Sequence, residues 1–129
     1  ALRVAWLAVA TLVLAGCATM TVNTITNLTP SRLPRKDNGQ YMFSVAFDTR
    51  QRTILKESIQ ATVIIGERAY TMERTPLVPS RWETLVPVPE DQHLVNYRFR
   101  FQYDYKAMPD IRAMVVDSKD YQLQFDAPW

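Results

Sequence analysis

Residues 95–106 contain the most regular pattern in the chain, an unbroken alternation of apolar and polar side chains. The apolar set consists of Val95, Tyr97, Phe99, Phe101, Tyr103 and Tyr105. Successive side chains of a β-strand point to opposite faces of a sheet, whereas at about 100° per residue these rings would surround a helix on every side. The pattern therefore predicts a central β-strand with one buried face and one polar face.

Shorter segments with the same character lie on both sides of this strand. Residues 41–48 and 59–65 alternate clearly, and residues 67–73 fit the partner strand of a hairpin. Residues 121–125 form the last strand-like segment of the domain. Residues 81–88 lie between prolines. Because proline cannot donate to a ladder of backbone hydrogen bonds, this fifth segment is predicted to be an edge strand or an interrupted one.

The remaining segments carry weaker signals. The threonine-rich residues 19–29 predict a short tether that runs into a first strand. Two prolines and an Asp-Asn-Gly turn predict a loop over residues 29–39, and residues 107–118 are predicted as a second loop. Residues 51–58 are the one stretch that could form a helical turn.

Seven strand-like segments of roughly even spacing predict an all-β fold, a single antiparallel β-sandwich. The order of segments resembles immunoglobulin-like and fibronectin type III domains, in which residues 95–105 would be the sixth strand. That resemblance implies a tyrosine corner at Tyr97 and a core position for Trp82. The sequence departs from the immunoglobulin pattern because Trp82 lies late in the chain and the disulfide is absent. A small closed β-barrel is the alternative fold.

The N-terminal residues have a different character from the rest. Arg3 precedes an uncharged run over residues 4–14, which has the length of a signal-peptide apolar segment. A transmembrane helix would need about 20 residues. The run ends in Leu14-Ala15-Gly16-Cys17. A buried apolar helix whose cysteine merely packs is the alternative interpretation.

The Leu14–Cys17 segment resembles the lipobox of bacterial lipoproteins. The resemblance implies cleavage before Cys17, a thioether-linked diacylglycerol on its sulfur and an amide-linked acyl chain such as palmitate. Two or more acyl chains hold a protein stably at a membrane. Ala18 stands where an aspartate would retain such a protein at the inner membrane, so we expect an envelope lipoprotein of the outer membrane, facing the periplasm or the cell surface.

These signals divide the chain into three parts. Residues 1–16 are the predicted signal peptide, residues 17–39 the lipidated tether, first strand and proline-rich loop, and residues 40–129 the remainder of the sandwich. The formal net charge of +2 argues against a nucleic-acid partner, which would call for a concentrated basic excess. Cys17 is the single cysteine, so the chain forms no intramolecular disulfide.

Neither catalysis nor metal binding has a recognisable set of residues. His93 is the only histidine and lies in a turn, there is no Gly-x-Ser-x-Gly motif, and no cysteine is free to act as a nucleophile. Zinc would need three or four clustered ligands, which the sequence does not offer. We therefore expect no catalytic residue, no metal site and no cofactor. An enzyme would require two carboxylates, such as Asp110 and Asp117, to converge.

Two groups of cations are candidate binding residues. Arg98 and Arg100 share the polar face of the central strand and could recognise a carboxylate or a sugar ring. The alternative is the plain solvent face of an antiparallel sheet. Arg32, Arg35 and Lys36 could contact lipid headgroups or an acidic partner, or remain solvated. The sequence thus favours a non-enzymatic binding, structural or assembly module that meets an envelope protein or glycan. An accessory enzyme with a loop-borne carbohydrate- or peptide-processing site is the alternative.

Overall fold

The computed structural model describes residues 22–126. Among these residues lie β1 (Asn23–Asn27), β2 (Arg32–Leu33), β3 (Gln40–Thr49), the 3₁₀ helix η1 (Lys56–Ser58), β4 (Gln60–Ile65), β5 (Arg68–Thr75), β6 (Val78–Pro87), β7 (Leu94–Ala107), β8 (Asp110–Asp117) and β9 (Tyr121–Phe125). The predicted signal peptide and Cys17 lie outside the described residues.

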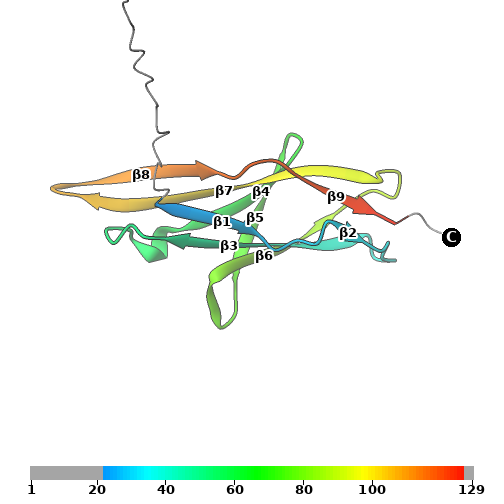
Figure 1. Ribbon diagram of the computed structural model, residues 1–129, viewed down its shortest axis with the longest axis horizontal. Coiled ribbons are helices and arrows are strands. Elements are labelled where there is room, and N and C mark those ends of the chain that lie inside the picture. The colour runs from blue at the N-terminus through cyan, green and yellow to red at the C-terminus, as the bar shows by residue number, and fades with distance from the viewer. Residues whose placement is uncertain (1–21, 127–129) are drawn as a thin grey trace, which may run out of the picture.

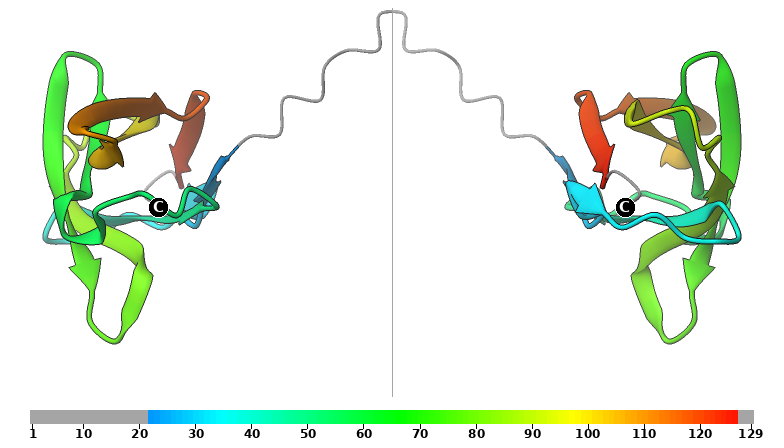
Figure 2. Two further views of the ribbon diagram at one scale, coloured as in Figure 1. Left: turned by 90° about the vertical axis from the view of Figure 1, so that its left-hand side faces the viewer. Right: turned by 90° about the vertical axis from the view of Figure 1, so that its right-hand side faces the viewer.

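The strands form one curled sheet whose two halves face each other as layers (Figures 1 and 2). The hydrogen-bonded order is β1-β3-β6-β5-β4-β7-β9-β2, and β8 pairs with β7 beside this path. All pairings are antiparallel except the short one between β2 and β9. The prediction of an all-β, antiparallel sandwich is confirmed, with nine strands in the described part of the chain in place of about seven.

Strand β5 joins the two layers. Its first residues pair with β4, from Arg68 to Met72, and its last residues pair with β6, from Glu73 to Thr75. The register shifts at Arg74 and Thr75, which marks a bulge. The extra residues of this bulge, 79–81, belong to β6, and a bulge bends the strand that carries the extra residues. The passage of β5 between the layers comes earlier, between Met72 and Glu73, where its partner changes from β4 to β6.

The core is built from aromatic rings that meet between β3 and β7. Phe47 stacks on Phe101 with ring centroids 4.4 Å apart, and Phe43 meets Tyr97 edge to face at 4.9 Å. Trp82 packs edge to face on Phe101. The apolar positions of the alternating segment are buried from Val95 to Tyr103, and the polar positions between them are not. The predicted central strand and its two faces are therefore confirmed.

The segment predicted as a loop over residues 107–118 is instead strand β8, which forms a long hairpin with β7. Its residues Ile111 to Val115 are all exposed. A strand with two exposed faces has no need for apolar and polar residues to alternate, so its sequence carried no period of two. The prediction for this segment was wrong.

Two further expectations from proline and loop signals hold only in part. Strand β6 pairs with β3 along residues 81–87, but with β5 only at Val78, Trp82 and Glu83. It is therefore an interior strand at its first half, with a bulge in the β5 pairing, and only its second half lacks a neighbour on the β5 side. Its prolines lie where a missing N–H is tolerated: Pro79 is at the bulge, and Pro87 is the last residue of the strand, where it is the register partner of Gln40. The predicted loop over residues 29–39 contains the two-residue strand β2, which pairs with the end of β9.

Tyr97 is buried but does not form a tyrosine corner. Its hydroxyl accepts a hydrogen bond from Asn27 Nδ2 of β1 at 2.8 Å, whereas a tyrosine corner binds the backbone a few residues upstream. Burial raises the pKa of Tyr97, and the hydrogen bond from Asn27 acts in the opposite direction. The Tyr97 hydroxyl thus links the edge strand β1 to the opposite layer.

The two faces of β7 should respond differently to truncation. Phe101→Ala should lower the free energy of unfolding by about 3–5 kcal/mol, because the side chain is fully buried and the stacked rings would leave a cavity. Arg98→Ala should change it by no more than about 0.5 kcal/mol. Denaturant midpoints measure both, and equal losses on the two faces would contradict this assignment.

Candidate binding surface

The even-numbered side chains of β7 form the outer face of their layer. Asn96, Arg98, Arg100 and Gln102 point away from the rings at Tyr97 and its odd-numbered neighbours. Pairing extends this face onto the adjacent strands, since Gln102 lies opposite Gln60 of β4, Arg100 opposite Asp117 of β8, and Asn96 opposite Gln122 of β9. We refer to these seven residues as the outer β7 face.

Arg100 is held in place by a two-point ion pair. Its Nε and one terminal nitrogen donate to the carboxylate oxygens of Asp117 at 2.7 and 3.0 Å. This bond lowers the pKa of Asp117; burial opposes the shift, and the positive charges of Arg100 and Arg98 add to it. Both partners remain accessible to solvent, so the pair orients the Arg100 guanidinium more than it stabilises the fold.

Arg98 shares the outer β7 face but pairs across the sheet with a different neighbour. It lies opposite Ile64 of β4 and close enough to Asp117 for its charge to act on that carboxyl group. The structure thus brings both predicted arginines together with one carboxylate. This arrangement offers a positively charged surface with one guanidinium in a defined orientation.

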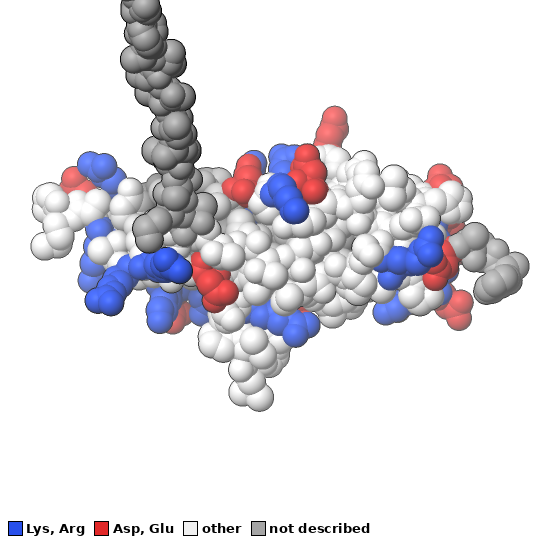
Figure 3. Space-filling view, viewed as in Figure 1, with Lys and Arg blue, Asp and Glu red and all other residues white. Residues whose placement is uncertain are grey.

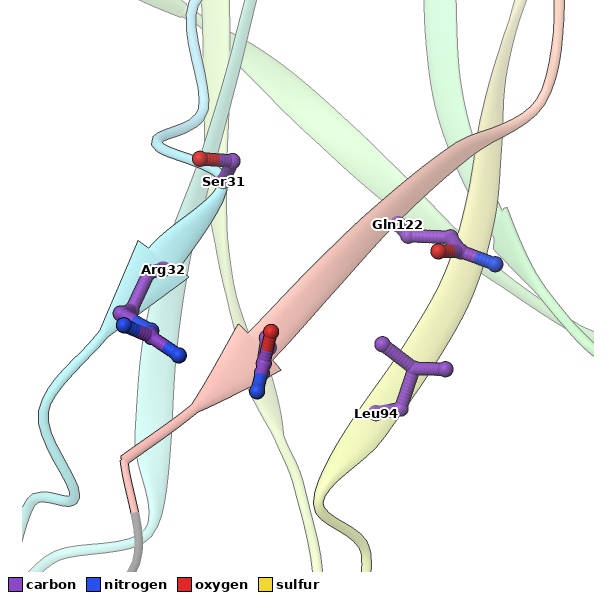
Figure 4. A pocket seen from close by; sticks show the side chains of 5 residues that line it. Ser31, Arg32, Leu94 and Gln122 are labelled. Carbon is purple, nitrogen blue, oxygen red and sulfur yellow. The ribbon is translucent and has the colours of Figure 1, made fainter.

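A shallow hollow of about 480 Å³ adjoins this face, where β2, β9 and β7 lie side by side (Figure 4). It is lined by Ser31, Arg32, Leu94, Gln122 and Gln124. Amide, hydroxyl and guanidinium groups surround one exposed aliphatic side chain, a mixture that can hydrogen-bond a polar ligand while packing against its apolar face. Sequence reasoning missed this hollow, because it depends on the parallel pairing of Arg32 with Gln124.

The basic cluster of the proline-rich loop has mostly structural contacts. The Arg35 guanidinium donates to the backbone carbonyls of Pro89, Glu90 and Gln92 and lies 4.7 Å above the Phe125 ring. Arg32 pairs with Asp126 at 3.2 Å. These contacts fasten the loop to the turn before β7 and to the end of β9, so two of its three cations already have partners.

The remaining candidate catalytic and metal-binding residues do not lie close together. Asp110 begins β8 and Asp117 ends it, so at about 3.3 Å per residue they are some 23 Å apart, too far to act as one acid–base pair. His93 is exposed in the turn before β7. Within residues 22–126 no three His, Cys, Asp or Glu side chains gather as a metal site would require. Cys17 lies outside the described residues, and its lipidation stays a prediction.

Comparisons with known proteins leave the chain without an assigned family. No family model matches it, and no curated protein matches it in sequence. Its backbone is similar to the solved structure of murine CRIg, with a TM-score of 0.46 and 14% identity over 80% of this chain and 98% of that chain. That likeness concerns backbone arrangement alone. Separately, no helix within residues 22–126 has the length and apolarity that crossing a membrane would take.

The Arg100–Asp117 pair should be visible in a titration. Arg100→Gln should raise the pKa of Asp117 toward its ordinary value, because the two hydrogen bonds that favour the carboxylate would be weakened. Carboxyl NMR shifts measure this, with Arg68→Gln as a control at a distant turn. An unchanged Asp117 pKa in Arg100→Gln would contradict the pairing.

The same pair should stabilise the fold only above acidic pH. A folded pKa below the unfolded value of about 3.9 contributes stability above that value, and this contribution disappears as pH falls through the folded pKa. Asp117→Asn should therefore be slightly less stable than the wild type near neutral pH, and the difference should vanish at strongly acidic pH. Denaturant midpoints across this range provide the measurement.

Proposed function

We propose that the chain is a lipid-anchored protein of the bacterial cell envelope that acts as a non-enzymatic binding or structural module. The observation that carries the binding role is the outer β7 face, which presents guanidinium and amide groups next to an open hollow. If this face of the sheet only had to be solvated, flexible lysine and glutamate side chains would be sufficient. Here the Arg100 guanidinium is instead fixed by Asp117.

The chemistry of this face suits a partner rich in hydroxyl and carboxylate groups. Guanidinium groups bind carboxylates through paired hydrogen bonds, and amides both donate to and accept from hydroxyl groups. An envelope glycan or an acidic segment of an envelope protein has those groups. The alternative of an accessory enzyme lacks a converging carboxylate pair among the described residues, since Asp110 and Asp117 lie at opposite ends of β8.

The anchor rests on the lipobox-like ending Leu14-Ala15-Gly16-Cys17. Cys17→Ser removes the sulfur that would accept diacylglycerol, so the precursor should remain uncleaved and should incorporate no labelled palmitate. A matched Ala18→Ser variant should be processed and labelled normally. Palmitate labelling that persists in Cys17→Ser would refute the anchor.

The partner-binding role is tested by removing both arginines of the face. Arg98→Gln/Arg100→Gln should fold with nearly unchanged stability, because both side chains are partly solvated, and should lose the molecules that co-purify with the wild-type lipoprotein from native membranes. Lys36→Gln/Arg68→Gln removes the same charge from exposed positions elsewhere and should keep them. Identical co-purification by both double variants would refute the role of this face.

A further inference from the structure

The start of β1 lies at the end of the sandwich where the β7–β8 hairpin turns (Figure 1). The carbonyl of Val22 accepts a hydrogen bond from the Arg50 N–H at 2.8 Å. Asn23 Nδ2 donates to the Tyr103 hydroxyl at 3.0 Å, and that hydroxyl donates to Gln51 Oε1 at 2.8 Å. The described chain therefore begins against the C-terminal half of β7.

Few residues separate this point from the proposed anchor. Cys17 precedes Val22 by five positions, and an extended chain advances at most about 3.6 Å per residue, or about 18 Å in all. This inference rests on the proposed function, because only a lipidated Cys17 fixes the chain to a bilayer. Given that anchor, the end of the sandwich that carries Val22 must stay close to the membrane surface.

That end also has an exposed apolar tip. Met108 is 87% exposed in the turn of the β7–β8 hairpin, and Ile111 at the start of β8 is 63% exposed. Lys106 pairs with Ile111, and Arg112 pairs with Tyr105, so cations follow the tip on both strands. Exposed apolar side chains bordered by Lys and Arg are typical of surfaces that rest in a headgroup layer.

The segment after β3 adds further cations to the same end. The Thr53 carbonyl accepts a hydrogen bond from the Lys106 N–H at 3.0 Å, which places this segment beside the hairpin. Arg50, Arg52 and Lys56 are exposed there. Figure 3 shows Lys and Arg side chains gathered at this end of the molecule. The acidic neighbours are Asp48, Glu57, Asp104 and Asp110.

Two other parts of the molecule can be compared with the β7–β8 hairpin: the β5–β6 hairpin and the proline-rich loop. Leu77 is fully exposed at the tip of the β5–β6 hairpin, which projects in a different direction from the β7–β8 hairpin (Figure 1). The proline-rich loop with Arg35 lies at the opposite end of the sandwich, next to β2. At the β5–β6 tip the nearby Arg74 already donates to the Lys56 carbonyl and lies over the Trp82 ring. Within residues 22–126, the β7–β8 hairpin is therefore the place where an exposed apolar tip and available cations occur together beside the start of β1.

We propose that the β7–β8 hairpin tip docks on the anionic phospholipid surface that holds Cys17. Met108 and Ile111 enter the headgroup layer, while Lys106, Arg112 and the cations at residues 50, 52 and 56 contact lipid phosphates. The lipid anchor and the hairpin then form two attachment points, which fix the orientation of the domain. The hollow at β2 and β9 lies at the other end, where it can reach a partner away from this membrane.

The test uses the mature lipoprotein purified from membranes, in which lipidation occupies Cys17 and leaves an introduced cysteine as the unique thiol. Met108→Cys is labelled with an environment-sensitive fluorophore, and the protein is reconstituted into phosphatidylethanolamine vesicles that contain phosphatidylglycerol and nitroxide-bearing lipid. We expect a blue shift and strong quenching at position 108. Leu77→Cys is the matched control and should show neither.

The charge contribution is tested in the Met108→Cys background. Lys106→Glu/Arg112→Glu should reduce quenching severalfold, as should omission of phosphatidylglycerol, whereas Lys36→Glu/Arg68→Glu should leave it unchanged. Quenching that is equal at positions 108 and 77, or insensitive to these charges, would overturn the docking. Protein that fails to float with vesicles would overturn the anchor together with this inference; protein that floats with an unquenched position 108 would overturn this inference alone.

Discussion

The stacking of Phe47 on Phe101 is the contact on which the rest of the structure depends. It joins β3 of one layer to β7 of the other, and Trp82, Tyr103, Tyr97 and Phe43 extend the packing in both directions. The described residues contain no cysteine, so no disulfide crosses between the layers. Apart from strand β5, which passes from one layer to the other, these rings hold the layers together. Aromatic rings suit this task because each buries a large apolar area with few rotatable bonds.

The polar outer surface follows from the same packing. Because the odd-numbered side chains of β7 are committed to the core, its even-numbered side chains must all point outward over the full length of the strand. Fourteen residues are long enough for β7 to pair with β9 near its start, β4 in its middle and β8 towards its end. One strand thus determines where the arginines lie, which carboxylate meets Arg100 and how far the hairpin extends beyond the sandwich.

The sequence allowed the core and its two faces to be predicted, because a strand with one buried side must alternate. The period of two in β3, β4, β7 and β9 identified these strands within one or two residues. Strand β8 was missed because it is exposed on both sides. The pairing of the first half of β6 with β5 was missed because a bulge that accommodates Pro79 leaves no local sequence signal. The shared face of Arg98 and Arg100 was predictable, whereas their common carboxylate Asp117 was not, since that pairing depends on β8. The hollow likewise depends on two residues of β2, a length too short for any periodic pattern.

The pairing of β1 with β3 has a mechanical consequence for a domain that is held at one end and loaded at the other. Strand β1 runs from the end of the sandwich that would carry the proposed anchor toward the opposite end, and it pairs with β3 through five residue pairs, from Asn23 to Asn27. A force applied through the N-terminus acts along this strand. It therefore loads all the hydrogen bonds between β1 and β3 in shear at once, instead of breaking one residue pair at a time. Five pairs that share a load resist far more force than the same pairs broken in succession. The hydrogen bonds from Asn23 to Tyr103 and from Asn27 to Tyr97 distribute that force onto β7, so a short edge strand can serve as a tension-bearing joint.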